Sequence, residues 1–451
     1  MPVRVLFAGV LVLTLCGSLL VPQSQPTGAS LLYTSTPRYE PLAWMEGADR
    51  FPQGATIFLK ARGPAKPIFP DFFATADANV SFDAKKVLFS GKRAASDRWQ
   101  IWEASIPPAT ARQVTHCDDD CVKPLNVPEE RFVYAHKVSG HFVLEIAPVQ
   151  ADGPAFQLTH TPGDSLPNDV LQDGRVLFAS DYPLDNGATA ELYTVYTDGS
   201  GVESYRCDHG HSRQAGKQIS SGDVVFVRDG KLFRFTSALA HEVSISAPGA
   251  TYAGDVSEAP GGWIVSSRAP SGKFFELRSW RPRSASLLPL VADSKSNLVQ
   301  PIAIVERAIP NRHPSAVHDW NYANVLCLNA YTSKDPIAEA AIASVRLYTR
   351  DAQGGIQVQG TAQVERDGSF YLRVPGDAPL RIELLDAGGK TVKSEAGWFW
   401  LRSGEQRICV GCHAGPERAP DNALPMVLQR STVAADLTAP HKPPALAAGG
   451  H

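Results

Sequence analysis

The sequence predicts an all-β protein in which a β-propeller of six or seven blades is followed by a small antiparallel β-sandwich. Three observations lead to this prediction. Short apolar strands recur after turns at a period of about 40–50 residues, long stretches with helical periodicity are absent, and the pattern changes downstream of about residue 335. With 451 residues, 35 Pro and 36 Gly, the chain is long enough for two or three globular domains.

The repeat consists of an apolar run after a turn, followed by a second strand. The third residues of five such runs lie 39 to 48 positions apart: Phe89, Tyr134, Phe178, Phe226 and Val265. This spacing indicates propeller blades, because a four-stranded sheet buries both of its faces only when neighbouring sheets stack on it. Residues 31–70 and 290–330 can add one or two blades, with an N-terminal strand closing the ring. We therefore assign residues 31–330 to the propeller.

Five strands are predicted in the next domain, which we place at residues 331–405. Their ranges are 341–348, 356–364, 368–374, 380–386 and 397–401. Asp367-Gly368 and Gly388-Gly389 stand where tight turns are needed. The pattern is typical of a small antiparallel β-sandwich or barrel. The aromatic side chains of Trp398-Phe399-Trp400, in the last strand, either wall a flat apolar cofactor or fill the core of this domain.

Residues 1–30 have the order of a secretory signal peptide. Arg4 supplies a positive charge, Val5 to Leu20 form an apolar run, and the polar stretch Gln23 to Ser30 follows. The apolar run is shorter than the roughly 20 residues that span a bilayer, and a retained anchor is the alternative. The sequence therefore predicts a protein exported to the periplasm.

The run Cys409-Val410-Gly411-Cys412-His413 is a C-x-x-C-H motif, the attachment signature of a c-type haem. Cys409 and Cys412 can each form a thioether to the haem edge, and His413 then ligates the iron from one side. A redox disulfide and half of a zinc site are the alternatives, but zinc needs a second ligand pair and the sequence has no other C-x-x-C. We assign residues 406–430 to a segment that binds one covalent haem c, and residues 431–451 to a disordered tail.

The reactivity of such a haem depends on the sixth position of the iron. Met426 is the only methionine after the motif, and a thioether from it would close the iron to substrates, as in an electron carrier. The alternative is that Met426 packs against the sandwich. The other candidates for this position are Met45, His313, His318, His441 and His451.

Four more cysteines remain outside the signal peptide and the motif: Cys117, Cys121, Cys207 and Cys327. Four thiols allow two disulfides in three connectivities. Cys117 and Cys121 flank three aspartates and are expected to close a small ring within one loop, with an acidic metal loop as the alternative. The run Cys207-Asp208-His209-Gly210-His211 is interpreted as a disulfide or polar loop in preference to a copper or zinc site.

An exported propeller, a β-domain and one terminal C-x-x-C-H motif together resemble the hydrazine synthase alpha-subunit family, over roughly residues 60–430. The most specific stretches are 312–315, 325–331, 367–370, 404–413 and 419–422. The resemblance implies a haem ligated by a tyrosine shortly after the motif, with the motif histidine bound to zinc. Residues 414–451 contain no Tyr, and this chain lacks the family enzyme's second haem-attachment site. We therefore expect the fold, and not hydrazine synthesis, to carry over.

The net charge of −3 and the lack of a basic cluster argue against a nucleic-acid partner. The sequence predicts a periplasmic mono-haem c-type redox protein that transfers single electrons, with the propeller docking a redox partner protein. One alternative is a hydrazine synthase alpha-like oxidoreductase whose open haem acts on a small nitrogen or oxygen species. Another is a binding propeller with a structural haem. Whether the chain is an enzyme is left open, and no catalytic side chain is assigned, because propeller loops converge only in three dimensions.

Overall fold

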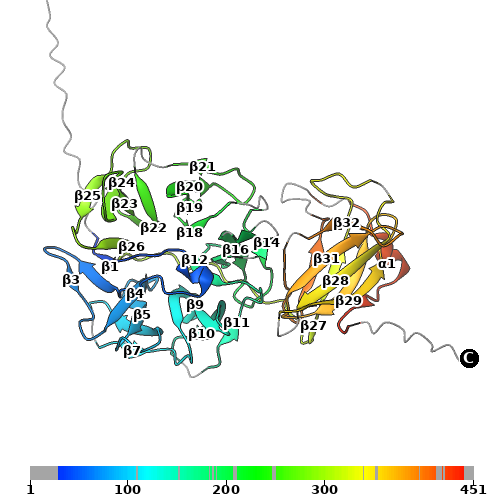
Figure 1. Ribbon diagram of the computed structural model, residues 1–451, viewed down its shortest axis with the longest axis horizontal. Helices are drawn as coiled ribbons and strands as arrows, with labels where there is room; N and C mark the ends of the chain where they lie inside the picture. The colour runs from blue at the N-terminus through cyan, green and yellow to red at the C-terminus, as the bar shows by residue number, and fades with distance from the viewer. Residues whose placement is uncertain are drawn as a thin grey trace, which may run out of the picture.

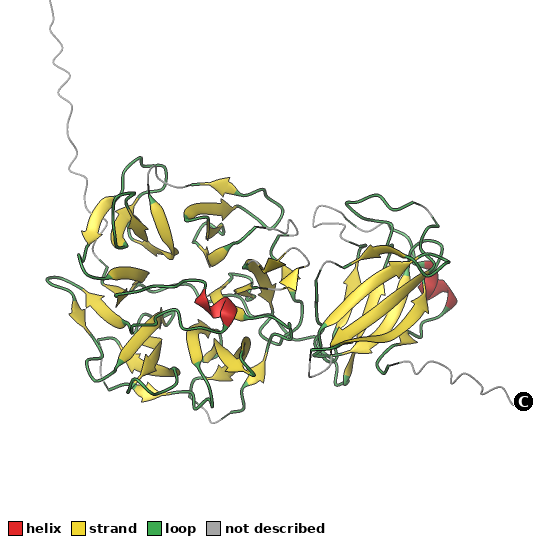
Figure 2. Ribbon diagram, viewed as in Figure 1, coloured by secondary structure: helices red, strands yellow, loops and turns green. Residues whose placement is uncertain are grey.

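The computed structural model describes residues 29–107, 110–150, 153–181, 183–184, 187–188, 190–206, 211–245, 250–338, 340–350, 354–395, 397–412, 419 and 422–440. The predicted signal peptide therefore lies outside the described residues, apart from Ala29 and Ser30. Within these ranges no helix has both the length and the apolar character that a membrane crossing requires. Strands dominate the described residues, and the two helices found among them are short: η1 (Ala43–Glu46) and α1 (Met426–Arg430) (Figure 2).

The first three four-stranded sheets come mainly from the N-terminal part of the chain. One has the order β26 (Asn297–Ala303), β1 (Leu31–Thr36), β2 (Thr56–Lys60), β3 (Lys66–Pro67). The next has β4 (Ala74–Val80), β5 (Lys86–Lys92), β6 (Gln100–Ser105), β7 (Arg112–Gln113). The third has β8 (Cys121–Val127), β9 (Arg131–Val138), β10 (His141–Pro148), β11 (Phe156–Gln157).

Three further sheets repeat the same antiparallel order. They consist of β12 (Ser165–Val170), β13 (Val176–Ser180), β16 (Glu191–Val195), β17 (Glu203–Ser204); β18 (Gln214–Gln218), β19 (Val224–Arg228), β20 (Lys231–Phe235), β21 (Val243–Ser244); and β22 (Thr251–Ala259), β23 (Gly262–Arg268), β24 (Glu276–Trp280), β25 (Leu288–Val291). A small ribbon of β14 (Pro183–Leu184) and β15 (Gly187–Ala188) interrupts the fourth sheet in sequence. The apolar runs of the sequence repeat, such as Val176-Leu177-Phe178, become fully buried second strands.

These six four-stranded sheets, all formed by described residues, are arranged in a ring like the blades of a propeller (Figure 1). Their first strands contact one another in turn, from β4 through β8, β12, β18 and β22 to β26 and back to β4. The ring is closed within one sheet, because β26 pairs with β1 and Leu31 lies opposite Ala303. Stacking of neighbouring sheets buries the apolar faces that a single sheet cannot cover.

The second domain consists of two packed four-stranded sheets. One has the order β33 (Gln406–Cys409), β27 (Tyr322–Cys327), β30 (Phe370–Pro375), β34 (Ala435–Asp436). The other has β29 (Ile356–Gln363), β28 (Ser344–Arg350), β31 (Leu380–Leu385), β32 (Thr391–Ser394). A core between them contains Val325, Leu347, Leu372 and Leu384. The sheet arrangement resembles the expected sandwich, but it is not wholly antiparallel, because β27·β33 and β30·β34 are parallel pairs.

Three features of this domain differ from the sequence expectation. Strand β27 lies before residue 331 and nevertheless belongs to the sandwich. The expected strand 397–401 makes a single bridge, between Leu380 and Phe399. The expected disordered tail is described as far as residue 440, since β34 pairs with β30 and Leu437 is buried in the sandwich core. Residues 441–451 lie outside the described ranges.

The two domains meet at an interface between the third and fourth propeller sheets and the segment that precedes β33. Trp398 and Trp400 are buried in the hydrophobic cluster of the propeller, and Leu401 lies in the sandwich core. The guanidinium of Arg402 lies 4.2 Å from the ring centre of Phe156. Arg407 donates a hydrogen bond to the carbonyl of Val202 at 2.9 Å. These contacts hold in place the residues that immediately precede the C-x-x-C-H motif.

Candidate functional site

The two motif cysteines lie at the end of β33, on the edge of one sandwich sheet. Cys409 is the register partner of Cys327 in the parallel pair of β33 with β27. Cys409, Cys412 and Cys327 are all free thiols, and both motif cysteines pack against the sandwich core. Covalent attachment of a haem requires two free thiols three positions apart, so the described residues fit a haem c. His413 and residues 414–418 lie outside the described residues.

Burial keeps these thiols protonated in the chain without haem. Burial, with a smaller contribution from the carboxylate of Glu395, raises the pKa of Cys412 to about 12. Burial also raises the pKa of Cys409 and that of Cys327. Sequence reasoning assigned no position to Cys327. Its place beside Cys409 follows only from the pairing of two strands that are far apart in the chain.

Gly411, inside the motif, is in close contact with the loop after β27. A Cβ added at Gly411 would lie 2.1 Å from the carbonyl oxygen of Thr332 and 2.8 Å from that of Asn329. Backbone atoms cannot move aside as a flexible side chain does, so this position has no room for any other residue. The motif turn is thus packed directly onto the β27 sheet.

Met426 begins the short helix α1, which is attached to the turn between β29 and β30. Its backbone N–H donates to the carboxylate of Asp367 at 2.7 Å, and the next N–H, of Val427, donates to the hydroxyl of Ser369 at 3.0 Å. The sulfur of Met426 accepts a hydrogen bond from Arg366 at 3.4 Å. The thioether sulfur therefore already accepts a hydrogen bond from the guanidinium of Arg366.

The other candidate iron ligands are distributed over the molecule. Met45 packs against the propeller cluster. His313 stacks on Tyr196 at a centroid distance of 3.6 Å. His318 stacks on Trp320, and its Nε2 lies 2.8 Å from the amide nitrogen of Gln406, three residues before Cys409. His441 and His451 lie outside the described residues.

Trp398 and Trp400 belong to the hydrophobic cluster of the propeller and not to the sandwich core. Both are almost completely buried among propeller residues, and Trp400 lies edge-on to His160 of the third sheet at 6.3 Å. The intervening Phe399 packs against the sandwich core. Alternate residues of this segment thus point to different domains, an arrangement that neither of the two sequence interpretations contained.

The cysteines outside the motif agree in part with the sequence prediction. Cys117 and Cys121 form the expected disulfide. Cys327 is a free thiol, and Cys207 to Gly210 lie outside the described residues, with only His211 of that run described.

The propeller holds a buried polar cluster that sequence analysis did not identify. Arg50 makes two hydrogen bonds to the carboxylate of Asp77, at 2.9 and 2.6 Å, and both side chains are buried. Burial alone would raise the pKa of Asp77, but the charge and hydrogen bonds of Arg50 hold it below its usual value. Gln300, on the closing strand β26, donates to the same carboxylate at 2.5 Å. The cluster therefore ties the closing sheet to its neighbour.

Comparison with known proteins relates the second domain to one family. Residues 338–414 match the family model for the hydrazine synthase alpha subunit middle domain. Hydrazine synthase subunit alpha from Kuenenia stuttgartiensis is 39% identical over 59 residues, which are 13% of this chain and 7% of that protein. The matched part is thus a small fraction of the length of this relative.

Solved structures extend the likeness to the fold of both domains. Kuenenia stuttgartiensis hydrazine synthase superposes with a TM-score of 0.77 at 17% identity, over 89% of this chain and 71% of that one. TolB from Acinetobacter baumannii covers 63% of this chain and 67% of its own, with a TM-score of 0.46 and 14% identity. The all-β architecture with propeller-like sheets is therefore shared with the hydrazine synthase structure.

Proposed function

We propose that this chain, which is hydrazine synthase alpha subunit-like, is an oxidoreductase that carries one covalent haem c and acts on a small nitrogen or oxygen species. The family match over residues 338–414 carries this proposal, because it contains the complete C-x-x-C-H motif. The unpaired state of Cys409 and Cys412 supports it, since a disulfide between them would block attachment. Bound through these thiols, the haem would supply one-electron chemistry and a binding position for a small ligand.

The surroundings of the motif support a role for the protein in orienting the haem. Gly411 lets the turn between the two thiols press against the loop after β27, which fixes both sulfur positions relative to the sandwich. His413 is the proposed iron ligand on one side. We propose that the interface with the propeller, through Arg402 and Arg407, holds this turn in place.

The position of Met426 favours an open iron over a closed one. The sulfur already accepts a hydrogen bond from Arg366, and the backbone of α1 is attached to Asp367 and Ser369. Ligation by Met426 would require the loss of the Arg366 contact. A closed haem with Met426 as the sixth ligand, which transfers single electrons to a docked partner protein, is the second candidate function.

An optical spectrum distinguishes the two candidates. The full chain is produced with its signal peptide in a host that matures c-type cytochromes. We expect a high-spin spectrum that changes on addition of nitric oxide or hydroxylamine. A low-spin spectrum that neither ligand alters, and that becomes high-spin in Met426→Ala, would establish the electron carrier instead. A colourless protein from a competent host would refute both.

Removal of one thioether tests the site itself. We expect Cys412→Ala to lose most of its covalent haem, because a single thioether and one axial ligand hold the group weakly during maturation. Covalent haem is measured by haem staining of the denatured protein. Cys327→Ala is the matched control, since Cys327 lies beside the motif without belonging to it, and it should keep its haem. Equal staining of Cys412→Ala and the unaltered chain would contradict the assignment.

We further propose that the chain works in the periplasm and with a protein partner. The signal-like residues 1–30 and the extracytoplasmic attachment of c-type haem support export. Fractionation of the producing cells tests this, and haem-stained protein confined to the cytoplasm would exclude it.

A further inference from the structure

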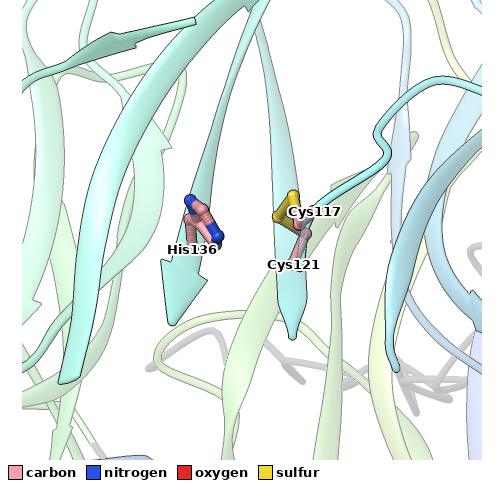
Figure 3. A group of neighbouring side chains, drawn as sticks. All are labelled: Cys117, Cys121 and His136. Atoms are coloured by element: carbon pink, nitrogen blue, oxygen red, sulfur yellow. A yellow bond between two sulfur atoms is a disulfide. The ribbon is translucent and has the colours of Figure 1, made fainter. Parts of the chain in front are cut away.

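Three potential metal-binding side chains meet on the third propeller sheet, far from the motif in sequence. The ligand atoms of Cys117, Cys121 and His136 all lie within 4.8 Å of one another (Figure 3). Cys121 opens β8 and is the register partner of His136 on β9, so both side chains leave the same face of the sheet. Cys117 reaches them from the loop before β8, where it forms the disulfide with Cys121.

The imidazole of His136 is held by a chain of hydrogen bonds. Its Nδ1 lies 3.0 Å from the carboxylate of Glu145 on β10, and the hydroxyl of Tyr134 donates to the same carboxylate at 2.6 Å. Nε2 is therefore the nitrogen of the His136 ring that does not bind Glu145. A carboxylate on the far nitrogen is the usual device that fixes a metal-binding histidine in one orientation.

Charge and exposure at this place suit a cation that enters from solvent. Asp118 and Asp119 lie between the two cysteines in the sequence and place two carboxylates next to this site. Cys121 is fully buried in an apolar cluster, whereas Cys117 is partly exposed. A reductant or an ion would therefore reach the pair through Cys117.

We propose that reduction of the Cys117–Cys121 disulfide opens a binding site for a thiophilic metal ion, Zn²⁺ or Cu⁺, with the two sulfurs and His136 as ligands. A dithiol reductant breaks the S–S bond by supplying two electrons and two protons, and is itself oxidised to a disulfide. The metal then displaces the two thiol protons. Thiolate and imidazole are the ligands that Zn²⁺ and Cu⁺ prefer, and three protein ligands leave a fourth position on zinc for water. The disulfide and the metal are thus mutually exclusive states of one site.

Zinc uptake by the haem-loaded full chain tests the proposal. Oxidised protein and protein reduced with a phosphine are each equilibrated with Zn²⁺ and desalted, and zinc is measured by mass spectrometry. We expect the reduced chain to retain about one more zinc than the oxidised chain, and Cys117→Ser/Cys121→Ser to lose this difference. Competition with a Cu⁺ chelator then shows which of the two ions the site binds more tightly.

Three single variants make the test specific. His136→Ala should bind zinc at least tenfold more weakly, and Glu145→Gln should weaken binding by about tenfold because it loosens the ring without removing a ligand. His116→Ala is the matched control, because its imidazole is exposed, lies 3.2 Å from the side-chain amide of Gln113 and belongs to the residue next to Cys117. Zinc binding by this variant should be unchanged. Thermal unfolding of each oxidised variant verifies folding independently. Equal zinc in the reduced and oxidised chain, or equal affinity of the His136 and His116 variants, would overturn the proposal.

Discussion

At the scale of single residues, the motif glycine has a steric role that the motif pattern does not reveal. A C-x-x-C-H signature places no demand on its two central residues. In this chain, however, the third residue lies directly against backbone carbonyls of the loop after β27. The same contact determines where both sulfurs lie relative to the sandwich core.

A substitution at this glycine is expected to disturb both stability and haem attachment. In Gly411→Ala the new methyl would clash with the Thr332 carbonyl, which forces the turn away from the sheet at a cost of about 1–3 kcal/mol. Denaturant unfolding and haem staining measure the two effects. Val410→Ala, at the neighbouring motif position, adds no atoms and should retain its haem. An unaltered stability of Gly411→Ala would show that the turn is not packed as described.

At the scale of elements, the propeller strands were predictable and the domain junction was not. The apolar runs at Val87, Val176 and Val224 are buried strands, as the repeat indicated. Strand β33 was not predicted. It is only four residues long, and it pairs in parallel with β27, which lies more than 75 residues earlier, so the sequence next to it contains no hairpin turn that would indicate a strand. The segment at Trp398 was predicted as a strand because its aromatic residues suit one.

The candidate site was predictable only as far as its chemistry is local. Cys409, Cys412 and the Cys117–Cys121 ring follow from spacing within a few residues. The positions of Cys327 beside the motif and of His136 beside the disulfide depend on strand pairing, which single residue types do not encode.

The aromatic segment before β33 leads to a prediction about the domain junction. Trp400 is 1% exposed and packs among propeller residues, so Trp400→Ala should cost about 3–5 kcal/mol and separate the two domains. Limited proteolysis should then cut between residues 303 and 322 faster than in the unaltered chain. Trp400→Phe keeps most of the apolar contact and should be cut more slowly than Trp400→Ala. If the unaltered chain, Trp400→Ala and Trp400→Phe were cleaved at the same rate, Trp400 would not be what stabilises the domain junction.

At the scale of the whole molecule, one partly buried histidine makes the contact between domains sensitive to acid. His160 of the propeller lies against Trp400, and its Nε2 is 3.6 Å from the carboxylate of Asp377 in the sandwich. That carboxylate favours the protonated ring, but burial is the larger effect, and the charge of Arg402 adds to it. Together they lower the pKa of His160 to about 4.

The sign of the resulting pH dependence follows from proton binding. Between pH 6.5 and about 4 the unfolded chain protonates this imidazole and the folded chain does not, so stability is complete above pH 6.5 and falls as the pH is lowered towards 4. We expect a loss on the order of 2 kcal/mol across this range. Thermal unfolding at several pH values measures it. His160→Gln has no such group and should show a smaller loss, whereas an equal loss in both proteins would assign the effect to other residues.

The closure of the ring has a consequence for how such a chain can be rearranged. Leu31 and Ala303, the outer ends of β1 and β26, face each other across a single antiparallel pair. A hairpin of two or three residues would therefore join them without moving a strand. Circularly permuted versions of the propeller, with new termini in a loop between any two blades, would then preserve every sheet.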